Sequence, residues 1–523
     1  MAGQASSPRA VSPPAWVPIV AFVALAAAIF ALSATIGGVT WDENIHRRGA
    51  VLQFSVAGGW LAGEATTFRS LPSDFAFYGI VPIGLVTGVD ALWNAVAGAP
   101  LPARAFGIWL HALTFVLCCL SALLVFDALR RQSRHRLTPW LGAAFLLLYP
   151  PWLGYGLMDY KDVPTAFFLL LLVYCCARAL EGNGEGLVRW TVFATLATIA
   201  LGGTKAAALA LAVVPWLAIT IAAFRQRRWA LPFLAVVGIV VGLVVVTPVS
   251  WPEPAAFFTA AVELMSRHPW PGCVLTNGAC IGPSHDDWSA AGYLWQWARV
   301  QLPVLVLVGL LPAIAAALWL GGVGRIAAGT LVFAIAAIIV RNASLYDGLR
   351  HVLFAVPLIV IVMFVAIDYA IAAWGRGARI AILALVGIEM ASFAIDDVRL
   401  FPYNYAYFNL ATRSDIDIDR FETDYWGFSL HEAVAGARAA AGRLGPVVGE
   451  PPLVVAASLP RRHRVYGGDD LRGSGYTGPY TLVRYTRGGH LPPEACETIA
   501  EVSRSLLGGP RHLFSYAARC EIE

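Results

Sequence analysis

Long apolar runs constrain this chain more than any other feature of its sequence. A helix needs about 20 apolar residues to cross the hydrocarbon core of a bilayer. Hydrophobic residues make up 58% of the 523 residues and charged residues 13%, whereas soluble domains carry about 25% charged residues. The sequence therefore predicts a polytopic α-helical membrane protein with about eleven transmembrane helices. The runs lie at Trp16–Ile36, Phe106–Leu129, Leu137–Leu157, Val163–Leu180, Trp190–Leu201, Ala206–Phe224, Trp229–Val249, Leu302–Leu320, Ile326–Val340, Val352–Ala373 and Ile380–Ile395.

Three of these runs allow a second interpretation. Residues 190–224 would make one helix of 35 residues, about 52 Å long at 1.5 Å per residue, against a core of about 30 Å. Gly202 and Gly203 interrupt it, which predicts a hairpin with Lys205 at its tip. The first run could be a signal peptide, because residues 31–34 resemble a cleavage site. The basic segment before it is weak, which favours an uncleaved first helix.

Arg-rich short loops set the predicted orientation. The segments 130–136, 225–228 and 375–379 fall on one side of the membrane, and such loops stay in the cytoplasm. The outer face then receives the loop after the first helix, the 158–162 turn, Lys205, the long 251–299 loop, the loop before residue 352 and the C-terminal region. Residues from about 50 to 100 are expected to form juxtamembrane helices in the outer interface. The abundance of Arg, Ala and Gly fits a GC-rich genome, so we expect a multi-pass protein of a bacterial inner (plasma) membrane.

The composition turns polar near residue 397. We expect residues 1–396 to form the transmembrane domain and residues 397–523 a small periplasmic α/β domain. Residues 451–458 and 480–486 are predicted to be strands, and residues 494–507 an amphipathic helix. Four cysteines lie in polar segments of the outer face, where disulfides persist. We expect the pairs Cys273–Cys280 and Cys496–Cys520.

Ionisable residues gather on the predicted outer face, which indicates that a charged lipid is handled there. Many such residues are only solvated loop charges, and an interfacial Arg often snorkels. Asp162 also suits an N-cap beside Pro164. Lys161 is different, because the helix dipole disfavours a cation near a helix start, and a phosphate would relieve this. Besides Lys205, the residues are Asp42 and Glu43 after the first run, Asp159, Lys161 and Asp162 before the fourth, and Tyr346, Asp347, Arg350 and His351 before a late one.

Several motifs recur together in this order. They are the Asp-Glu pair at 42–43, the Lys-Asp-x-Pro turn at 161–164, the Tyr-x-x-x-Arg-His segment at 346–351, and an outer tail that reads PYNYAYFN and later FETDYWGFSLHEA. The chain resembles the GT-C superfamily of integral-membrane glycosyltransferases. It looks close to bacterial relatives of the dolichyl-phosphate-mannose protein mannosyltransferases and to the lipid A aminoarabinose transferase group. The resemblance implies a sugar donor carried on a polyprenyl phosphate.

The resemblance also implies roles for individual residues. The family's first-loop acidic motif, which supplies the catalytic base, maps onto Asp42 and Glu43. Its second acidic turn maps onto Asp162, and its late-span basic residue maps onto Arg350. A positioned base and a cationic clamp on the leaving phosphate, without a covalent nucleophile, predict a single displacement with inversion. We expect Lys161, Lys205, Arg350 and His351 to bind the donor phosphate, with Asp162, Asp347 and Tyr346 in support.

Residues 421–429 of the outer tail alternate aromatic and acidic side chains. Aromatic rings stack on sugar faces and carboxylates accept bonds from hydroxyls, so Asp424, Tyr425 and Trp426 are candidates for acceptor binding. The alternative is that the aromatic residues anchor the tail to the membrane domain.

Two other functions fit a polytopic protein. A transporter or flippase of lipid-linked sugars usually shows internal repeats and charges near the bilayer midplane. We find no repeat, and Glu389 is the clearest charged residue outside the outer face. An inactive scaffold with a periplasmic binding domain is the third interpretation.

The partners follow from the same reasoning. We expect the bilayer, a polyprenyl-phosphate sugar donor, and a lipid, glycan or protein acceptor. The net charge of +4 is dispersed, which argues against nucleic acid. No metal-ligand spacing is present, although Glu43, His46 and His351 could contribute to a divalent site.

Overall fold

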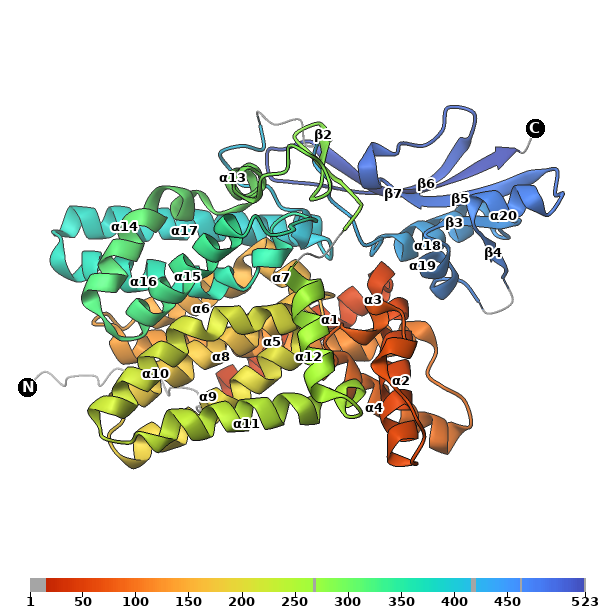
Figure 1. Ribbon diagram of the computed structural model, residues 1–523. Helices are drawn as coiled ribbons and strands as arrows, with labels where there is room; N and C mark the ends of the chain where they lie inside the picture. The colour runs from red at the N-terminus through yellow and green to blue at the C-terminus, as the bar shows by residue number, and fades with distance from the viewer. Residues whose placement is uncertain (1–15, 267–269, 415–419, 461–462, 522–523) are drawn as a thin grey trace, which may run out of the picture.

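The computed structural model describes residues 16–266, 270–414, 420–460 and 463–521. A body of helices is joined to a C-terminal sheet with helices of its own (Figure 1). The helices of the body are α1 (Trp16–Ile36), α2 (Trp41–Leu61), α3 (Ser73–Ala76), α4 (Val81–Ala97), α5 (Ala103–Gln132), α6 (Thr138–Leu148), α7 (Pro150–Gly156), α8 (Asp162–Glu181), α9 (Glu185–Thr204), α10 (Val213–Arg225), α11 (Ala230–Val246), α12 (Pro254–Ser266), α13 (Ala290–Gln301), α14 (Val304–Leu320), α15 (Gly322–Val340), α16 (Ala355–Ala373) and α17 (Arg376–Leu400). Short 3-10 turns are η1 (Phe68–Ser70), η2 (Ala206–Ala212), η3 (Pro248–Ser250), η4 (Arg350–Val352), η5 (Asn404–Ala406) and η7 (Arg487–Gly489).

The polytopic helical architecture is confirmed, but the count of eleven spans is not. By length and composition, seven described helices could cross a membrane, or up to eight if the bent pair α1–α2 counts as one span. The other predicted ranges are interrupted by proline. Helix α6 ends before Pro150, and α11 and α14 have 17 residues each, bounded by Pro248 and Pro303 respectively. A 17-residue helix is about 25 Å long, which is shorter than a core of about 30 Å.

The predicted break between residues 190 and 224 is confirmed. Helix α9 ends at Thr204, and Lys205 lies in extended backbone between α9 and η2. Ala206–Arg225 forms a separate apolar unit of η2 and α10. Lys205 therefore stands at a helix junction, away from the middle of either helix.

Two helices form the centre of the body. The apolar windows of α8 and α16 are 72% and 78% buried, against 22–44% in the other five candidate spans. Helices that are apolar all round pack best in such a central position. Helix α8 begins at Asp162, and Arg350 lies in η4 shortly before α16, so charged residues stand at or just before the starts of the two central helices.

The C-terminal region contains a five-stranded sheet in the order β4-β3-β5-β7-β6. Strand β3 is parallel to β4 and β5, whereas β7 is antiparallel to β5 and β6. Helices α18 and α19 lie between this sheet and the helical body, and α19 contacts α2 (Figure 1). The elements are β3 (Val447–Glu450), β4 (Val465–Tyr466), β5 (Pro479–Tyr485), β6 (Glu497–Ser505), β7 (Arg511–Glu521), α18 (Leu430–Ala441), α19 (Pro452–Ala457) and α20 (Gly468–Gly473).

The small α/β architecture of the tail is confirmed, although two of its elements were predicted wrongly. The strand at 480–486 is present as β5. Residues 451–458 contain helix α19, because Pro452 at its start and the alanines at its end suit a helix. Residues 494–507 contain strand β6 in place of a helix, because β7 offers it a long antiparallel ladder. Tertiary pairing there outweighs the local periodicity.

Both predicted disulfides are confirmed. Cys496–Cys520 joins the start of β6 to β7. Cys273–Cys280 closes a hairpin of β1 (Val274–Thr276) and β2 (Ala279–Ile281). The turn of this hairpin is Asn277–Gly278, and both residues have positive φ, as a two-residue type I′ turn requires.

Candidate functional site

Asp42 stands at the corner between α1 and α2, which are bent by 98°. The corner is held by backbone hydrogen bonds from Gly38 N to Phe428 O and from Trp41 N to Trp426 O, each 3.0 Å long. A side chain at Gly37 would collide with the Phe428 ring, so glycine permits this close approach. The tail segment 421–429 therefore fixes the place where α2 begins, and with it the position of Asp42.

The Asp42 carboxylate faces Lys161, whose Nζ donates to Oδ2 at 2.6 Å. The two side chains are 21% and 17% exposed, so the pair is accessible from outside. Burial works against the charged form of Lys161, but the Asp42 charge outweighs it, and the pKa of Lys161 lies above its ordinary value. The structure thus brings the predicted base next to a predicted phosphate ligand.

Glu43 points away from Asp42, although the two residues are neighbours in the chain. Its Oε1 accepts from Thr40 N and lies 2.8 Å from His111 Nε2 of α5. The residue is only 2% exposed. Glu43 therefore caps its own helix and ties α2 to α5, and this geometry favours a structural role for it.

The turn before α8 uses Asp159, a residue without an assigned role in the sequence, as its capping group. Asp159 Oδ1 accepts from the backbone N–H groups of Lys161 and Asp162 at 3.1 and 3.0 Å. Burial raises the pKa of Asp159 to about 7, and the neighbouring Asp162 charge adds to the rise. Because Asp159 does the capping, the Asp162 carboxylate is left to bind cations.

A chain of alternating charges extends from α8 to the C-terminal region. Asp162 pairs with Lys205 at 2.8 Å and with Arg350 at 3.6 Å. Asp347 pairs with Arg350 at 2.9 Å through one oxygen and with Arg487 at 3.3 Å through the other. Arg487 continues the chain to Glu422 at 3.0 Å. The structure thus gathers three predicted phosphate ligands, Lys161, Lys205 and Arg350, at one end of the bundle.

Trp426 lies between two of these cations. Its ring centroid is 4.7 Å from the Arg350 guanidinium carbon and 5.7 Å from Lys161 Nζ. The Arg350 guanidinium carbon also lies 4.9 Å from the centroid of the Tyr346 ring and 5.9 Å from that of Tyr425. Aromatic faces attract cations without neutralising them, so these rings hold the basic side chains in place and leave their charge available to an anion.

The other predicted site residues lie around this centre. The His351 and Tyr346 rings are 4.3 Å apart, and Tyr346 stacks on Trp270. Tyr425 is buried, and its hydroxyl donates to that of Tyr155 at 2.7 Å. Asp424 is 1% exposed and accepts from Tyr405 Oη, Phe428 N, Ser429 N and Ser429 Oγ. This burial favours the anchoring interpretation of the segment over direct contact between Asp424 and an acceptor.

Sequence reasoning missed Arg487 and did not explain Glu389. Arg487 is a single basic residue between two strands, so no local pattern marks it. Glu389 accepts from Val304 N and Leu305 N at 3.1 and 3.0 Å, and therefore caps the start of α14. Glu389, the clearest charged residue outside the predicted outer face, thus has a structural explanation.

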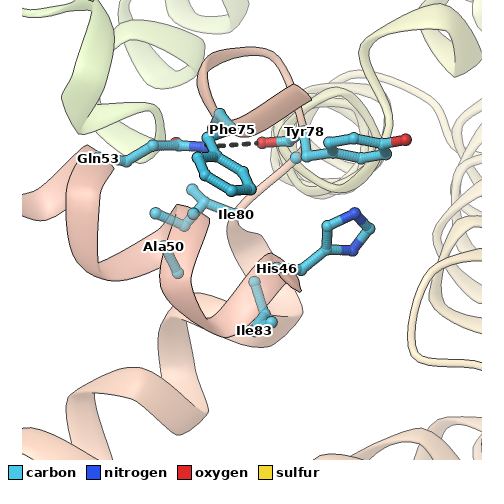
Figure 2. Close-up of a pocket in the computed structure, with 9 residues that line it drawn as sticks. His46, Ala50, Gln53, Phe75, Tyr78, Ile80 and Ile83 are labelled. Atoms are coloured by element: carbon cyan, nitrogen blue, oxygen red, sulfur yellow. Dashed lines mark hydrogen bonds between the residues drawn. The ribbon is translucent and has the colours of Figure 1, made fainter. Parts of the chain in front are cut away.

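A small pocket lies along the face of α2 that begins at Asp42. Figure 2 shows His46 and Gln53 of α2 opposite Phe75 and Tyr78. The His46 and Tyr78 ring centroids are 4.0 Å apart, and His46 Nδ1 contacts the hydroxyl of Tyr160. Residues four and eleven positions after Asp42 share its face of the helix, so the pocket continues the site along α2.

Within the ranges that the structure describes, no group of three or more His, Cys, Asp or Glu side chains is arranged to hold a metal ion. Glu43, His46 and His351 therefore do not form the divalent site considered from the sequence.

No family model matches the chain, and no curated protein matches it in sequence. Similar solved structures include ArnT from Cupriavidus metallidurans in the apo state, with 14% identity over 96% of this chain and 97% of that chain and a TM-score of 0.45. ArnT from the same organism bound to undecaprenyl phosphate has 14% identity over 97% of this chain and 98% of that chain, with a TM-score of 0.48. The arabinosyltransferase EmbB from Mycobacterium smegmatis has 17% identity over 78% of this chain and 44% of that chain, with a TM-score of 0.31. With TM-scores below 0.5, these similarities assign no role to any residue of this chain.

Proposed function

We propose that this protein is an inverting glycosyltransferase that moves a sugar from a polyprenyl-phosphate donor to a cell-envelope acceptor. Asp42 is the general base, and Lys161, Lys205 and Arg350 hold the phosphate. The observation that carries the proposal is the meeting of these four side chains, from four separate elements, at one end of an apolar helical bundle.

The state of Arg350 supports an anionic ligand. Its side chain is 4% exposed, and its Nε–H has no hydrogen-bond partner among the residues that the structure describes. A buried donor without a partner is costly, and a phosphate oxygen would satisfy it with a charge-assisted bond. Lys205 is 31% exposed, so its ammonium group can reach such a phosphate from the neighbouring helix junction.

The reaction would proceed as a single displacement. The acceptor hydroxyl oxygen attacks the anomeric carbon while Asp42 takes its proton. The bond between that carbon and the phosphate oxygen breaks, and the electron pair leaves with the polyprenyl phosphate. The leaving group gains negative charge, which the preorganised Lys161, Lys205 and Arg350 stabilise in a poorly hydrated site. Attack opposite to the leaving group inverts the anomeric configuration.

The predicted topology places this site on the periplasmic face of a bacterial inner membrane. Residues 1–396 then form the catalytic transmembrane domain and residues 397–523 the periplasmic domain. The tail segment 421–429 closes over the site, because Trp426 contacts both Arg350 and Lys161. The acceptor can be a lipid, a glycan or a protein, and it would enter beside Asp42.

The proposal is tested with the purified full-length protein in lipid nanodiscs. The protein is supplied with a panel of polyprenyl-phosphate sugars and with cell-envelope extract from a strain that lacks the gene. The expected result is release of polyprenyl phosphate together with a sugar-bearing product of inverted anomeric configuration.

The controls distinguish the competing functions. Arg350→Lys should abolish most of the polyprenyl phosphate release. Asp127→Asn should not, because Asp127 lies near the C-terminal end of α5, where its carboxylate bonds Arg130 and Arg131. Transbilayer movement of the intact donor without sugar release would identify a transporter instead. Absence of both activities with every donor would leave the scaffold interpretation.

A further inference from the structure

We propose that Arg487 of the C-terminal region is a positioning residue for Arg350, and that the disulfide-closed hairpin at 273–280 holds Arg487 in place through Glu422. This inference rests on the proposed function, in which Arg350 binds the donor phosphate. It gives the C-terminal region a direct part in building the phosphate site.

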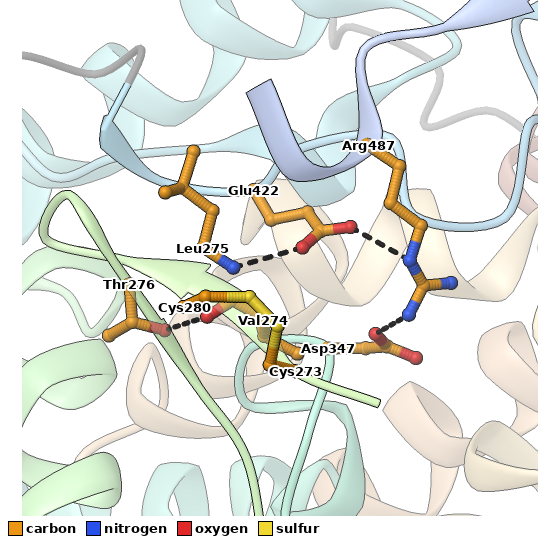
Figure 3. Close-up of a disulfide and its surroundings, with 8 residues drawn as sticks. All are labelled: Cys273, Val274, Leu275, Thr276, Cys280, Asp347, Glu422 and Arg487. Atoms are coloured by element: carbon orange, nitrogen blue, oxygen red, sulfur yellow. Dashed lines mark hydrogen bonds and ion pairs between the residues drawn. A yellow bond between two sulfur atoms is a disulfide. The ribbon is translucent and has the colours of Figure 1, made fainter. Parts of the chain in front are cut away.

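The first link joins the hairpin to the tail segment. Glu422 N donates to Leu275 O at 2.9 Å, and Leu275 N donates to Glu422 Oε2 at 3.1 Å. Gly278 N donates to Arg420 O at 2.8 Å. The hairpin thus pairs with residues 420–422 much as a neighbouring strand would. The Cys273–Cys280 disulfide closes the two ends of the hairpin (Figure 3).

The second link is between Glu422 and Arg487. The Glu422 side chain is 1% exposed, and its Oε1 lies 3.0 Å from Arg487 Nε. The same guanidinium group donates through Nη1 to the backbone oxygen of Tyr425 at 2.9 Å. Together with Nη2, which faces Asp347, all three nitrogen atoms of the Arg487 guanidinium group have a partner, and this fixes the direction in which the side chain points.

The third link passes through Asp347 to Arg350. Arg487 Nη2 lies 3.3 Å from Asp347 Oδ1, while Arg350 Nη2 lies 2.9 Å from Asp347 Oδ2 (Figure 3 shows the Arg487 side of this bridge). Asp347 has a φ of +57°, the left-handed conformation in which Asp is several-fold enriched among side-chain-bearing residues. Its carboxylate lies between the two arginines and pairs with each through a different oxygen.

Two carboxylates thus fix the orientation of the Arg350 side chain. One is Asp162 from the membrane helices, and the other is Asp347, which Arg487 holds in place. Without Arg487, one Asp347 oxygen would lose its partner, and the carboxylate could turn toward Arg350 and grip it in another geometry. Arg350 would keep its charge, but its guanidinium group would point in a different direction. A planar guanidinium group binds two phosphate oxygens at once only when it faces the phosphate in the right direction.

The test measures binding of undecaprenyl phosphate alone to the full-length protein in nanodiscs, so that no acceptor is needed. Arg487→Met should weaken this binding about tenfold, the loss that one charge-assisted bond implies. Arg487→Lys should restore part of it, and Cys273→Ser/Cys280→Ser should weaken it in the same direction. Arg484→Met is the matched control. Arg484 lies three residues earlier, is also 27% exposed and is also ion-paired, but with Glu450.

A double-mutant cycle separates positioning from a general structural role. If Arg487 acts through Arg350, adding Arg487→Met to Arg350→Lys should weaken binding little further. Two outcomes would overturn the inference and leave the proposed function standing. One is that the losses of the two variants are additive. The other is that Arg487→Met binds the lipid as well as Arg484→Met does, while Arg350→Lys binds it weakly. Normal binding by Arg350→Lys would refute the proposed phosphate site itself. If Arg487→Met does not fold, Arg487→Lys and Glu422→Gln carry the same comparison.

Discussion

Replacing Asp42 by Asn removes the proposed base with the smallest possible change in shape. Asn keeps an amide oxygen at the position of Oδ2, which lies 2.6 Å from Lys161 Nζ, so the contact between α2 and the 158–162 turn can persist. The pair is partly exposed, and losing its charge attraction should lower the free energy of unfolding by on the order of 1 kcal/mol. The variant should therefore insert and fold.

The effect on catalysis should be much larger. Loss of a general base costs about 10²–10⁴-fold in rate, which is at least about 2.7 kcal/mol of barrier at 1.36 kcal/mol per tenfold. The assay is a single-turnover reaction with a polyprenyl-phosphate sugar, and thermal unfolding is followed on the same sample. A hundredfold slower reaction with a nearly unchanged unfolding temperature is the expected result.

Two further variants complete the comparison. Asp127→Asn changes another ion-paired carboxylate and should leave turnover unchanged. Glu43→Gln should show the opposite pattern from Asp42→Asn, with a lower unfolding temperature and a smaller loss of turnover, because Glu43 links Thr40 to His111. Near-normal turnover in well-folded Asp42→Asn would refute the assignment of the base.

Three other predictions follow from the same site. Arg350→Lys should lower kcat/KM for the donor at least about tenfold, because an ammonium group cannot keep the fork geometry toward a phosphate; an unchanged value would remove Arg350 from the clamp. Trp426→Ala should lower the free energy of unfolding by about 3–5 kcal/mol, since the ring is buried; normal stability with a raised acceptor KM would instead mark an acceptor contact. The raised pKa of Asp159 means that its contribution to stability is complete below its ordinary value of 3.8 and is lost as the pH rises through about 7. Asp159→Asn should therefore flatten the fall in unfolding temperature between pH 5 and pH 8, and identical slopes for the two proteins would contradict the shift.

Local chemistry in the sequence was enough to predict the class of architecture. The energy of burying apolar side chains in a bilayer is additive along a run, so the runs predict helices without knowledge of their neighbours. The junction at Lys205 and the two disulfides also follow from segment length and compartment. The positions of Asp42, Lys161 and Arg350 at the ends of apolar runs made them candidates for the same reason.

The role of each site residue depends on the packing of distant segments against one another. Asp42 and Glu43 are adjacent in the chain, but successive helical residues point about 100° apart, and only the presence of Lys161 on one side and His111 on the other separates them. Asp159, and not Asp162, caps the turn before α8, because the turn folds back so that the Asp159 carboxylate faces the backbone of the same turn. Arg487 reaches Asp347 across 140 residues of sequence, and β6 is a strand because β7 lies beside it. Contacts between distant segments depend on the three-dimensional arrangement of the whole chain, which no local pattern of residue types encodes.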